Sequence, residues 1–293
     1  METASLDLDH LREWIGKTES QTDLITSVPI AALSATLDRD DPQPREGDNL
    51  PPLWHWLYFL PMHRESELGA DGHPKRGGFI PPVPLPRRMF AGGRLQFHRP
   101  LRAGEEIRRV SRIANVTHKI GRSGPLIFVL ARHEISNQEG LALVEEHDIV
   151  YRDHGQPGER AQIPQAAPTN ESWSREVLAD AVMLFRYSAL TFNPHRIHYD
   201  LKYCTEVEKY PGLVVHGPLI ATLLADLLRR NAPNATVTSF SFRAVRPLFD
   251  TTAFSVCGRF DTNGNAAKLW AKDAEGWLAM EATATLGVTL LSR

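Results

Sequence analysis

Apolar and polar residues alternate along two stretches of the chain, 133–152 and 269–288. A period of two residues is typical of strands with one buried face. Each stretch is interrupted by an Asn or Asp followed by Glu-Gly, which indicates a tight turn at Gly140 and at Gly276. The pattern therefore predicts that each half of the chain ends in an antiparallel meander.

The two halves of the chain are similar to each other. Arg-Pro-Leu occurs at 99–101 and again at 246–248, an offset of 147 residues in a chain of 293. Further upstream, residues 50–61 correspond to residues 210–230, so the order helix, loop, helix, strands occurs twice. A fixed internal period indicates a duplicated unit. One helix followed by a twisted antiparallel sheet predicts an α+β fold in which the sheet wraps the helix.

The clearest helix begins at Gly217 and Pro218, two residues that suit a helix N-terminus. Apolar residues then recur at helical spacing at Leu219, Ile220, Leu223, Leu224, Leu227 and Leu228. Residues 153–172 are polar, rich in Pro, Gly and Gln, and without a period, which indicates a linker. We therefore expect an N-terminal unit over 1–152 and a C-terminal unit over 173–293.

Composition narrows the range of partners. A formal net charge of −2 and the lack of a long basic run argue against nucleic-acid binding, so we expect a small-molecule partner. Cys204 and Cys257 are far apart and lack CxxC spacing, which argues against a disulfide framework and a thiolate metal site. The N-terminus lacks the segments of a secretory signal, and no apolar run reaches membrane-spanning length. These features predict a cytoplasmic protein without membrane association.

The stretch TFNPHRIHYD, residues 191–200, concentrates ionisable and amide side chains. Together with GLVVHGPLIATLLADLL, residues 212–228, it resembles the MaoC-like, or hydratase 2, family of acyl-thioester hydratases and dehydratases. The family signature is Asp-x-Asn-Pro-x-His-x-Asp, followed by a His-Gly pair at the start of the central helix. The matching positions here are Asn193 for the first Asp, His195 for the Asn, Arg196 for the Pro, His198 for the His, Asp200 for the last Asp, and His216 with Gly217 for the His-Gly pair. The resemblance implies a double hotdog fold, a CoA thioester as substrate and no cofactor.

Two upstream stretches extend the resemblance. PRRMFAGG at 86–93 and KIGRSGPL at 119–126, together with the Asn-containing motif, are similar to the hydratases of itaconyl-, mesaconyl- or methylfumaryl-CoA. They also resemble the mitochondrial 3-hydroxyacyl-thioester dehydratases. This implies a short, branched, dicarboxylic acyl group. Because the first half lacks the motif, we expect it to be a degenerate copy that shapes the substrate tunnel.

Hydration of an enoyl thioester needs a base for the water and stabilisation of the enolate oxygen. His198 suits the first role, because imidazole titrates near neutral pH. Gly217 suits the second role, because a helix N-terminus presents free N–H groups. Asn193 can position a water but cannot transfer a proton. Asp200 could instead provide a carboxylate that orients His198, and the sequence leaves both alternatives open.

The other two histidines are expected to support the site. His195 should brace the motif loop, and His216 should brace the helix entry beside the substrate. With His198 and Asp200 they could supply metal ligands, but their spacing matches no zinc motif. We therefore expect no metal ion.

Four basic residues are candidates for substrate binding. Arg87 and Arg88 precede a Gly-Gly pair, and Lys119 and Arg122 flank a Gly-rich turn. Either pair could bind CoA phosphates or a distal carboxylate. Either pair could equally be solvated surface charge.

The favoured hypothesis is a hydro-lyase that adds or removes water at a short acyl-CoA. One alternative is a 3-hydroxyacyl-thioester dehydratase of fatty-acid synthesis. Another is a non-catalytic acyl-CoA-binding protein, because Asn193 replaces a carboxylate. Two fused hotdog units already form a pseudo-dimer, yet an exposed sheet edge could still pair two chains into a homodimer.

Overall fold

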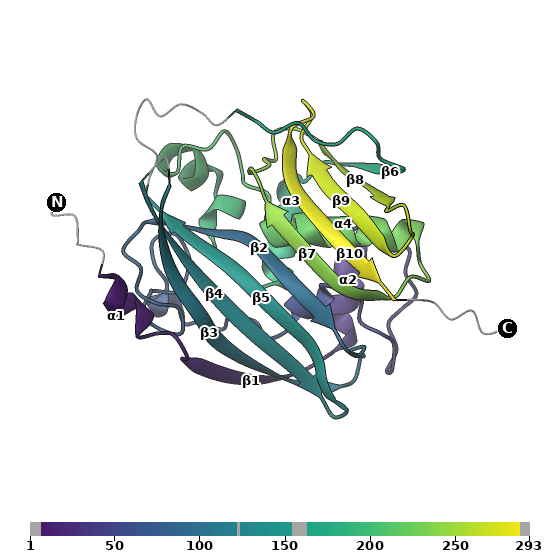
Figure 1. Cartoon of the computed structure of the whole chain (residues 1–293), viewed down its shortest axis with the longest axis horizontal. Coiled ribbons are helices and arrows are strands. Elements are labelled where there is room, and N and C mark those ends of the chain that lie inside the picture. The colour runs from purple at the N-terminus through teal and green to yellow at the C-terminus, as the bar shows by residue number, and fades with distance from the viewer. Residues whose placement is uncertain (1–6, 122–123, 154–162, 288–293) are drawn as a thin grey trace.

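The computed structural model describes residues 7–121, 124–153 and 163–287. Ten strands form one sheet in the order β1-β3-β4-β5-β2-β7-β10-β9-β8-β6 (Figure 1). The strands of the first half are β1 (Thr18–Leu24), β2 (Arg87–Phe97), β3 (Glu106–Gly121), β4 (Gly124–Asn137) and β5 (Gly140–Arg152). Those of the second half are β6 (Trp173–Val177), β7 (Val237–Ala244), β8 (Phe254–Phe260), β9 (Ala266–Lys272) and β10 (Leu278–Leu286). Antiparallel pairing of β2 with β7 makes the sheet continuous across the two halves.

The strand pairs predicted from residue alternation are present in both halves. β4 and β5 form one hairpin, and β9 and β10 form the other. The turn glycines Gly140 and Gly276 have φ values of 111° and 87°. Residues with a side chain rarely adopt such values, so glycine is needed at both turns. Buried and more exposed side chains alternate along β4, as expected for a sheet with one face on the core.

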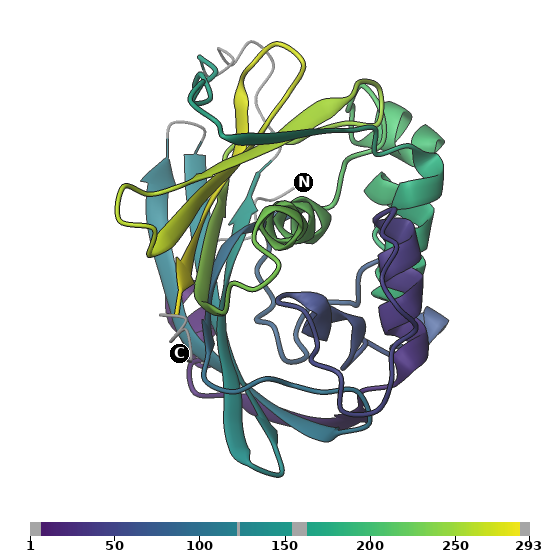
Figure 2. The same cartoon turned by 90° about the vertical axis from the view of Figure 1, so that its right-hand side faces the viewer.

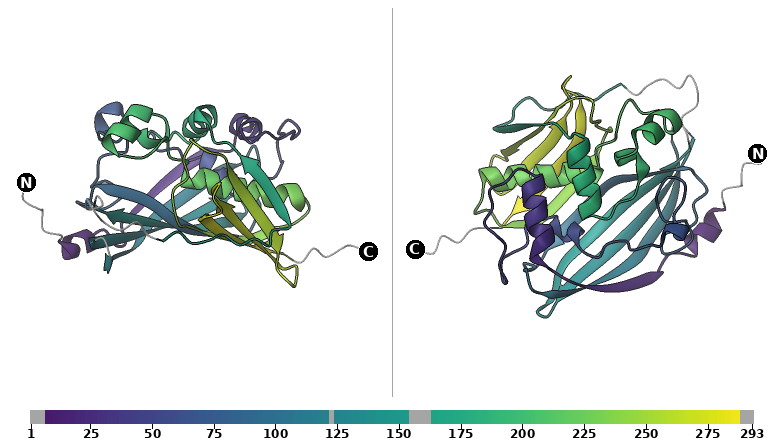
Figure 3. Two further views of the ribbon diagram at one scale, coloured as in Figure 1. Left: turned by 90° about the horizontal axis from the view of Figure 1, so that it is seen from above. Right: turned by 180° about the vertical axis from the view of Figure 1, so that it is seen from behind.

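The helix predicted after Gly217 is α4 (Gly217–Asn231). Figure 2 shows it end-on inside the curve of the sheet, where it packs against β8, β9 and β10. Helices α2 (Ser27–Thr36) and α3 (Ala181–Leu190) pack on each other and lie on the side of α4 that faces away from the sheet (Figures 2 and 3). The molecule thus has three layers: the sheet, α4, and the pair formed by α2 and α3. The short helix α1 (Leu8–Arg12) contacts β3.

The α+β class is as predicted, but the first half differs in one respect. Residues 50–61 were expected to form a central helix, and they contain only the 3-10 turn η1 (Trp54–Leu57). Prolines at 51, 52 and 61 confine any helix of this segment to a short stretch, because proline cannot donate within a helix and disfavours helical geometry in the preceding residue. Leu53 and Phe59, on either side of η1, have positive φ values of 71° and 54°. Within the described residues, a long central helix therefore exists only in the second half.

The expected linker, 153–172, lies partly outside the described residues. Its described end runs along the second half, where Ala166 forms a β-bridge with Trp277. The unit boundaries at 152 and 173 remain a prediction. No helix in the described part of the chain is both long and apolar enough to cross a membrane.

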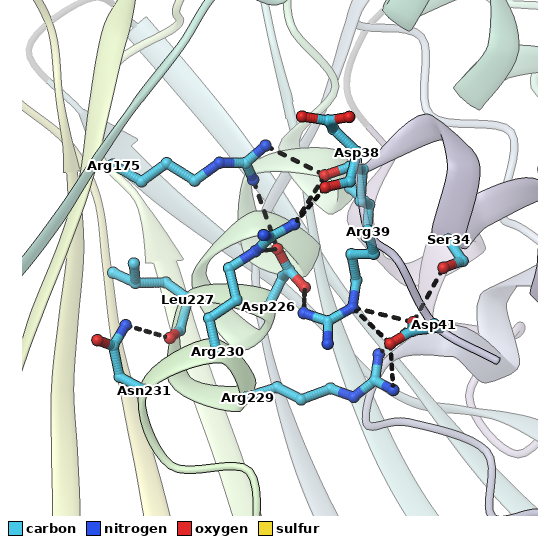
Figure 4. A network of polar contacts seen from close by, with 11 residues as sticks. Ser34, Asp38, Arg39, Asp41, Arg175, Asp226, Leu227, Arg229, Arg230 and Asn231 are labelled. Carbon is cyan, nitrogen blue, oxygen red and sulfur yellow. Dashed lines mark hydrogen bonds and ion pairs between the residues drawn. The ribbon is translucent and has the colours of Figure 1, made fainter.

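A buried ionic network holds α4 to its surroundings (Figure 4). The side chain of Asp226, on α4, is 1% exposed and accepts hydrogen bonds from Arg39 at 2.7 Å and from Arg230 at 2.7 Å. Arg175 of β6 lies 3.4 Å from the same carboxylate. Arg175 and Arg230 also donate to the carbonyl of Leu37, which satisfies the C-terminal end of α2.

We expect Asp226→Ala to destabilise the protein strongly. Removal of one member of a buried charge cluster leaves its partners unpaired, at a cost of about 3–5 kcal/mol. The exposed pair of Asp9 with Arg12 provides a matched control, since Asp9→Ala should cost less than about 1 kcal/mol. Urea unfolding followed by circular dichroism measures both changes. A cost for Asp226→Ala no larger than the control would contradict a supporting role for this network.

Candidate active site

The motif stretch 191–200 lies between α3 and α4, at the N-terminal end of α4. Its loop is shaped by two hydrogen bonds of Asn193: the backbone amide donates to the carbonyl of Ser188, and the side-chain oxygen accepts from the amide of His195 at 3.1 Å. The stretch then forms the 3-10 turn η3 (Arg196–His198). Asn193 thereby fixes the shape of the loop in addition to any contact that it makes with a ligand.

His198 is buried, and its tautomer follows from its hydrogen bond. Its Nδ1 lies 2.7 Å from the carbonyl oxygen of Val214. Because a carbonyl only accepts, Nδ1 carries the proton and Nε2 keeps a free lone pair. Burial lowers the pKa of His198 to about 4, although the bond to Val214 opposes this effect. At neutral pH the ring is therefore uncharged and Nε2 can act as a base.

The ring of His216 packs against one face of the His198 ring. It is fully buried, its Nε2 lies 2.8 Å from the hydroxyl of Ser188, and its ring stacks on His198 with centroids 3.7 Å apart. Burial holds the pKa of His216 well below its usual range. Because the His216 ring is enclosed and neutral, its stacking can fix the orientation of the His198 ring.

Gly217 is the first residue of α4, so its N–H has no partner within the helix. A Cβ built at this position would lie 3.8 Å from the ring of Phe90, which is an ordinary contact distance. The glycine leaves the helix N-terminus uncovered, which is the geometry that an oxyanion site needs.

The role considered for Asp200 as the partner of His198 does not agree with the structure. Its Oδ2 accepts from Arg196 at 2.7 Å, and its Oδ1 accepts from the amide of Tyr203 at 3.0 Å. Nδ1 of His198 instead donates its hydrogen bond to the carbonyl of Val214. Asp200 therefore binds Arg196 and the amide of Tyr203, the first residue of the π-helical turn η4 (Tyr203–Val207), and does not orient His198.

Two residues absent from the sequence analysis lie beside the motif. Nδ1 of His73 lies 3.1 Å from Oδ2 of Asp71, and the ring of His73 packs on His195 with centroids 4.0 Å apart. His195 in turn meets His198 edge-to-face at 5.4 Å. Asp71 and His73 come from a Gly- and Lys/Arg-rich loop of the first half, and nothing in their local sequence resembles a known motif.

Asp71, His73 and His195 form the group in the described part of the chain that could hold a metal ion, with ligand atoms within 4.8 Å of one another. Two positive charges oppose this use. Burial and the charges of Arg88 and Arg76 lower the pKa of His73 to about 4, and the same charges would repel a cation. The three residues do not match the set considered from the sequence, since His195 is the only member of both sets. We continue to expect no metal ion.

The structure separates Arg87 from Arg88. Arg87 donates to the backbone carbonyl of Glu208 at 3.0 Å and lies over the ring of Tyr210. Arg88, its neighbour on β2, points to the opposite face. Burial is the largest cause that lowers the pKa of His195, and the charge of Arg88 adds to it. Among the described residues, no carboxylate lies within ion-pair distance of Arg88. Of the two, Arg88 is therefore the one whose charge can serve a ligand.

Lys119 lies on β3, near the end of the strand that leads to β4. Lys119 is exposed, with its ammonium 5.2 Å from the ring centre of Phe128. Arg122 lies outside the described residues. A role for either residue in CoA binding remains a prediction.

The state of His198 predicts the pH dependence of catalysis. Its pKa is lowered, so the free lone pair persists to more acidic pH than that of an ordinary histidine near 6.5. The rings around it, His73, His195 and His216, are also held neutral by burial and add no charge at neutral pH. We expect kcat/KM to stay level from about pH 8 to about pH 5 and to fall as pH approaches about 4. Circular dichroism at each pH controls for unfolding, and a midpoint near 6.5 in folded protein would contradict the prediction.

Comparison with solved structures identifies the fold. The chain is similar to a protein described as "MaoC-like dehydratase", with a TM-score of 0.70, 12% identity, and coverage of 93% of this chain and 98% of that one. A MaoC-like dehydratase from Phytophthora capsici gives a TM-score of 0.69 at 12% identity, over 96% of this chain and 99% of that one. The hotdog architecture expected from the sequence is thus confirmed.

Sequence comparison identifies the family. The chain is 48% identical to the mesaconyl-C(4)-CoA hydratase of Chloroflexus aurantiacus over 274 residues, which cover 94% of this chain and 97% of that protein. It is 28% identical to the mitochondrial hydroxyacyl-thioester dehydratase type 2 of Schizosaccharomyces pombe, over 80% of this chain and 88% of that protein. The family model for hydroxyacyl-thioester dehydratase type 2 matches residues 53–250. The protein is therefore a hydro-lyase that belongs to the hydroxyacyl-thioester dehydratase type 2 family.

Proposed function

We propose that this enzyme adds water to mesaconyl-C4-CoA, or to a very similar short dicarboxylic acyl-CoA, and catalyses the reverse dehydration. The observation that carries this proposal is the 48% identity to a mesaconyl-C(4)-CoA hydratase over almost the whole of both chains. The guanidinium of Arg88, whose charge acts on His195 and which has no carboxylate partner among the described residues, supports it. The cytoplasmic location, the absence of a cofactor and a homodimeric state remain predictions.

The proposed chemistry uses three groups of the motif region. The free Nε2 of His198 accepts a hydrogen bond from the water and polarises it. The N–H of Gly217, at the N-terminus of α4, stabilises the negative charge that develops on the thioester oxygen, an effect worth about 3 kcal/mol for one donor. Asn193 holds the loop and the water in place. The neutral state of His198 supports this assignment.

Arg88 is the proposed partner of the distal carboxylate. A guanidinium can bind a carboxylate through two parallel hydrogen bonds. Arg87 is engaged with the carbonyl of Glu208, which makes it the weaker candidate. A dehydratase of fatty-acid synthesis is the alternative, favoured by the 28% identity to the fission-yeast protein, but an unbranched alkyl chain would bring no carboxylate to the charge of Arg88.

Substrate preference tests this assignment. We expect kcat/KM for mesaconyl-C4-CoA to exceed that for crotonyl-CoA, and Arg88→Gln to reduce the ratio by about 10–100-fold, because only the dicarboxylate loses a charged partner. Arg243→Gln, a change at an exposed arginine on β7, should leave the ratio unchanged. Both values come from the absorbance of the conjugated thioester. Faster turnover of straight-chain enoyl-CoAs by the wild type would favour the fatty-acid dehydratase.

Substitutions in the motif test the chemistry. His198→Ala should lower kcat by about 10³-fold, because the polarising nitrogen is lost. Asp200→Asn should cost less than about 10-fold, since Asp200 bonds to Arg196 and Tyr203 and not to His198. Asn193→Ala should fall between the two, and Asn193→Asp should retain substantial activity. Near-normal kcat in folded His198→Ala, or a loss of about 10³-fold in Asp200→Asn, would contradict the scheme.

A further inference from the structure

The first half of the chain makes a close contact with the motif loop. Gly72 has a φ of +89°, and a Cβ at this position would lie 1.9 Å from the carbonyl oxygen of Pro194. No side chain fits there, so the two backbones touch. The amide of Arg196 donates to the carbonyl of Asp71 at 2.9 Å, and its guanidinium donates to the carbonyl of Ala70 at 3.0 Å. The loop from Ala70 to His73 is thus docked on the motif by its backbone.

This docking places a carboxylate and an imidazole at the site in a defined state. Oδ1 of Asp71 accepts from the amide of His73 at 3.0 Å, while Oδ2 lies 3.1 Å from its Nδ1. An ionised carboxylate only accepts, so Nδ1 of His73 carries the proton and Nε2 has a free lone pair. Although burial raises it, the bonds from His73 hold the pKa of Asp71 well below its usual range, so the carboxylate is ionised. His73 therefore has the same tautomer as His198, and its Nδ1 faces the negative charge of Asp71.

The motif itself contains no carboxylate that can do this. Asn193 carries an amide, which neither takes nor gives a proton at neutral pH. Asp200 is turned away and bound to Arg196. Asp71 is close enough to act electrostatically on the row of rings formed by His73 and His195, because its charge opposes the lowering of the pKa of both. The first half thus brings to the site the charge that the motif lacks.

We propose that His73, held by Asp71, is the general base of the reaction and acts on the water that His198 also contacts. In the hydration direction the water oxygen bonds to the β-carbon while one water proton passes to Nε2 of His73. The electron pair of the double bond moves through the α-carbon to the thioester oxygen. The enolate then re-forms the carbonyl and takes the proton from His73 at the α-carbon, so that water is added and His73 is neutral again.

The hydrogen-bond partners favour His73 over His198 as the proton acceptor. A protonated His73 keeps its bond to the carboxylate of Asp71, whose charge opposes the repulsion from Arg88 and Arg76, whereas a protonated His198 would face only the neutral carbonyl of Val214. A carboxylate beside an imidazole stabilises the imidazolium that forms during proton transfer. The unprotonated Nε2 of His198 accepts a hydrogen bond from the other hydrogen of the water. This assignment rests on the proposed hydratase activity and adds to it a residue of the first half.

The test replaces His73 by Asn, because the Asn side-chain amide can still donate to Asp71 but cannot take a proton. We expect His73→Asn to lower kcat for mesaconyl-C4-CoA by about 10²–10⁴-fold, the range for loss of a general base. Binding of methylsuccinyl-CoA, a saturated analogue, should change by less than about threefold, since the loop stays docked. Asp71→Asn should lower kcat by about 10-fold or more. His63→Asn, at a half-exposed histidine of the same segment, is the matched control.

A rescue experiment separates proton transfer from support of the loop. Added imidazole should raise the turnover of His73→Ala in proportion to its concentration, and it should not affect His198→Ala or the wild type. Folded His73→Asn with kcat within about threefold of wild type, or His73→Ala that binds the analogue but does not respond to imidazole, would overturn the assignment. So would a wild-type enzyme that loses activity in EDTA and regains it with zinc, because Asp71, His73 and His195 would then be ligands. Wild-type protein that turns over no enoyl-CoA refutes the proposed function itself, whereas active wild type with active His73→Asn refutes this assignment alone.

Discussion

The position of α4 depends on the buried carboxylate of Asp226. A charge with 1% exposure is tolerated only when counter-charges surround it, and these come from three places: Arg39 after α2, Arg175 on β6, and Arg230 on α4 itself. Shifting α4 along its axis would break these pairs at once. The network therefore fixes the helix against both halves of the chain, and with it the N–H groups at its N-terminus.

The N-terminal end of α4 is held by neutral contacts. Ser188 of α3 binds His216, which stacks on His198, whose Nδ1 is tied to Val214 just before the helix. Charge thus fixes the C-terminal part of α4, while hydrogen bonds and ring stacking fix the end that faces the substrate. Burial is what lowers the pKa of His198 and leaves it able to accept a hydrogen bond from water.

Features with a local cause could be predicted from the sequence. Alternation of residue type predicted the hairpin of β4 and β5, and the leucine spacing after Gly217 predicted α4. A helix at 50–61 was expected by analogy with the second half, and that prediction was wrong because the backbone leaves helical geometry at Leu53 and again at Phe59, ahead of Pro61. The contact of Gly72 with Pro194 joins positions that are far apart in sequence, so no local pattern could indicate it. The partner of Nδ1 of His198 is a backbone carbonyl, which has no signature in the sequence.

The asymmetry between the halves follows from this division of roles. The second half keeps the long helix and the motif, while the first half has lost its helix and buries Glu145, which accepts from His55, Trp56 and His147. A copy used only as a spacer would need neither this polar core nor the backbone contact at Gly72. Because the loop bearing Asp71 meets the motif loop through main-chain atoms, a substitution of Gly72 would separate the two halves of the site without touching any ionisable group. The proposed site therefore depends on the contact between the halves, and neither half contains it alone.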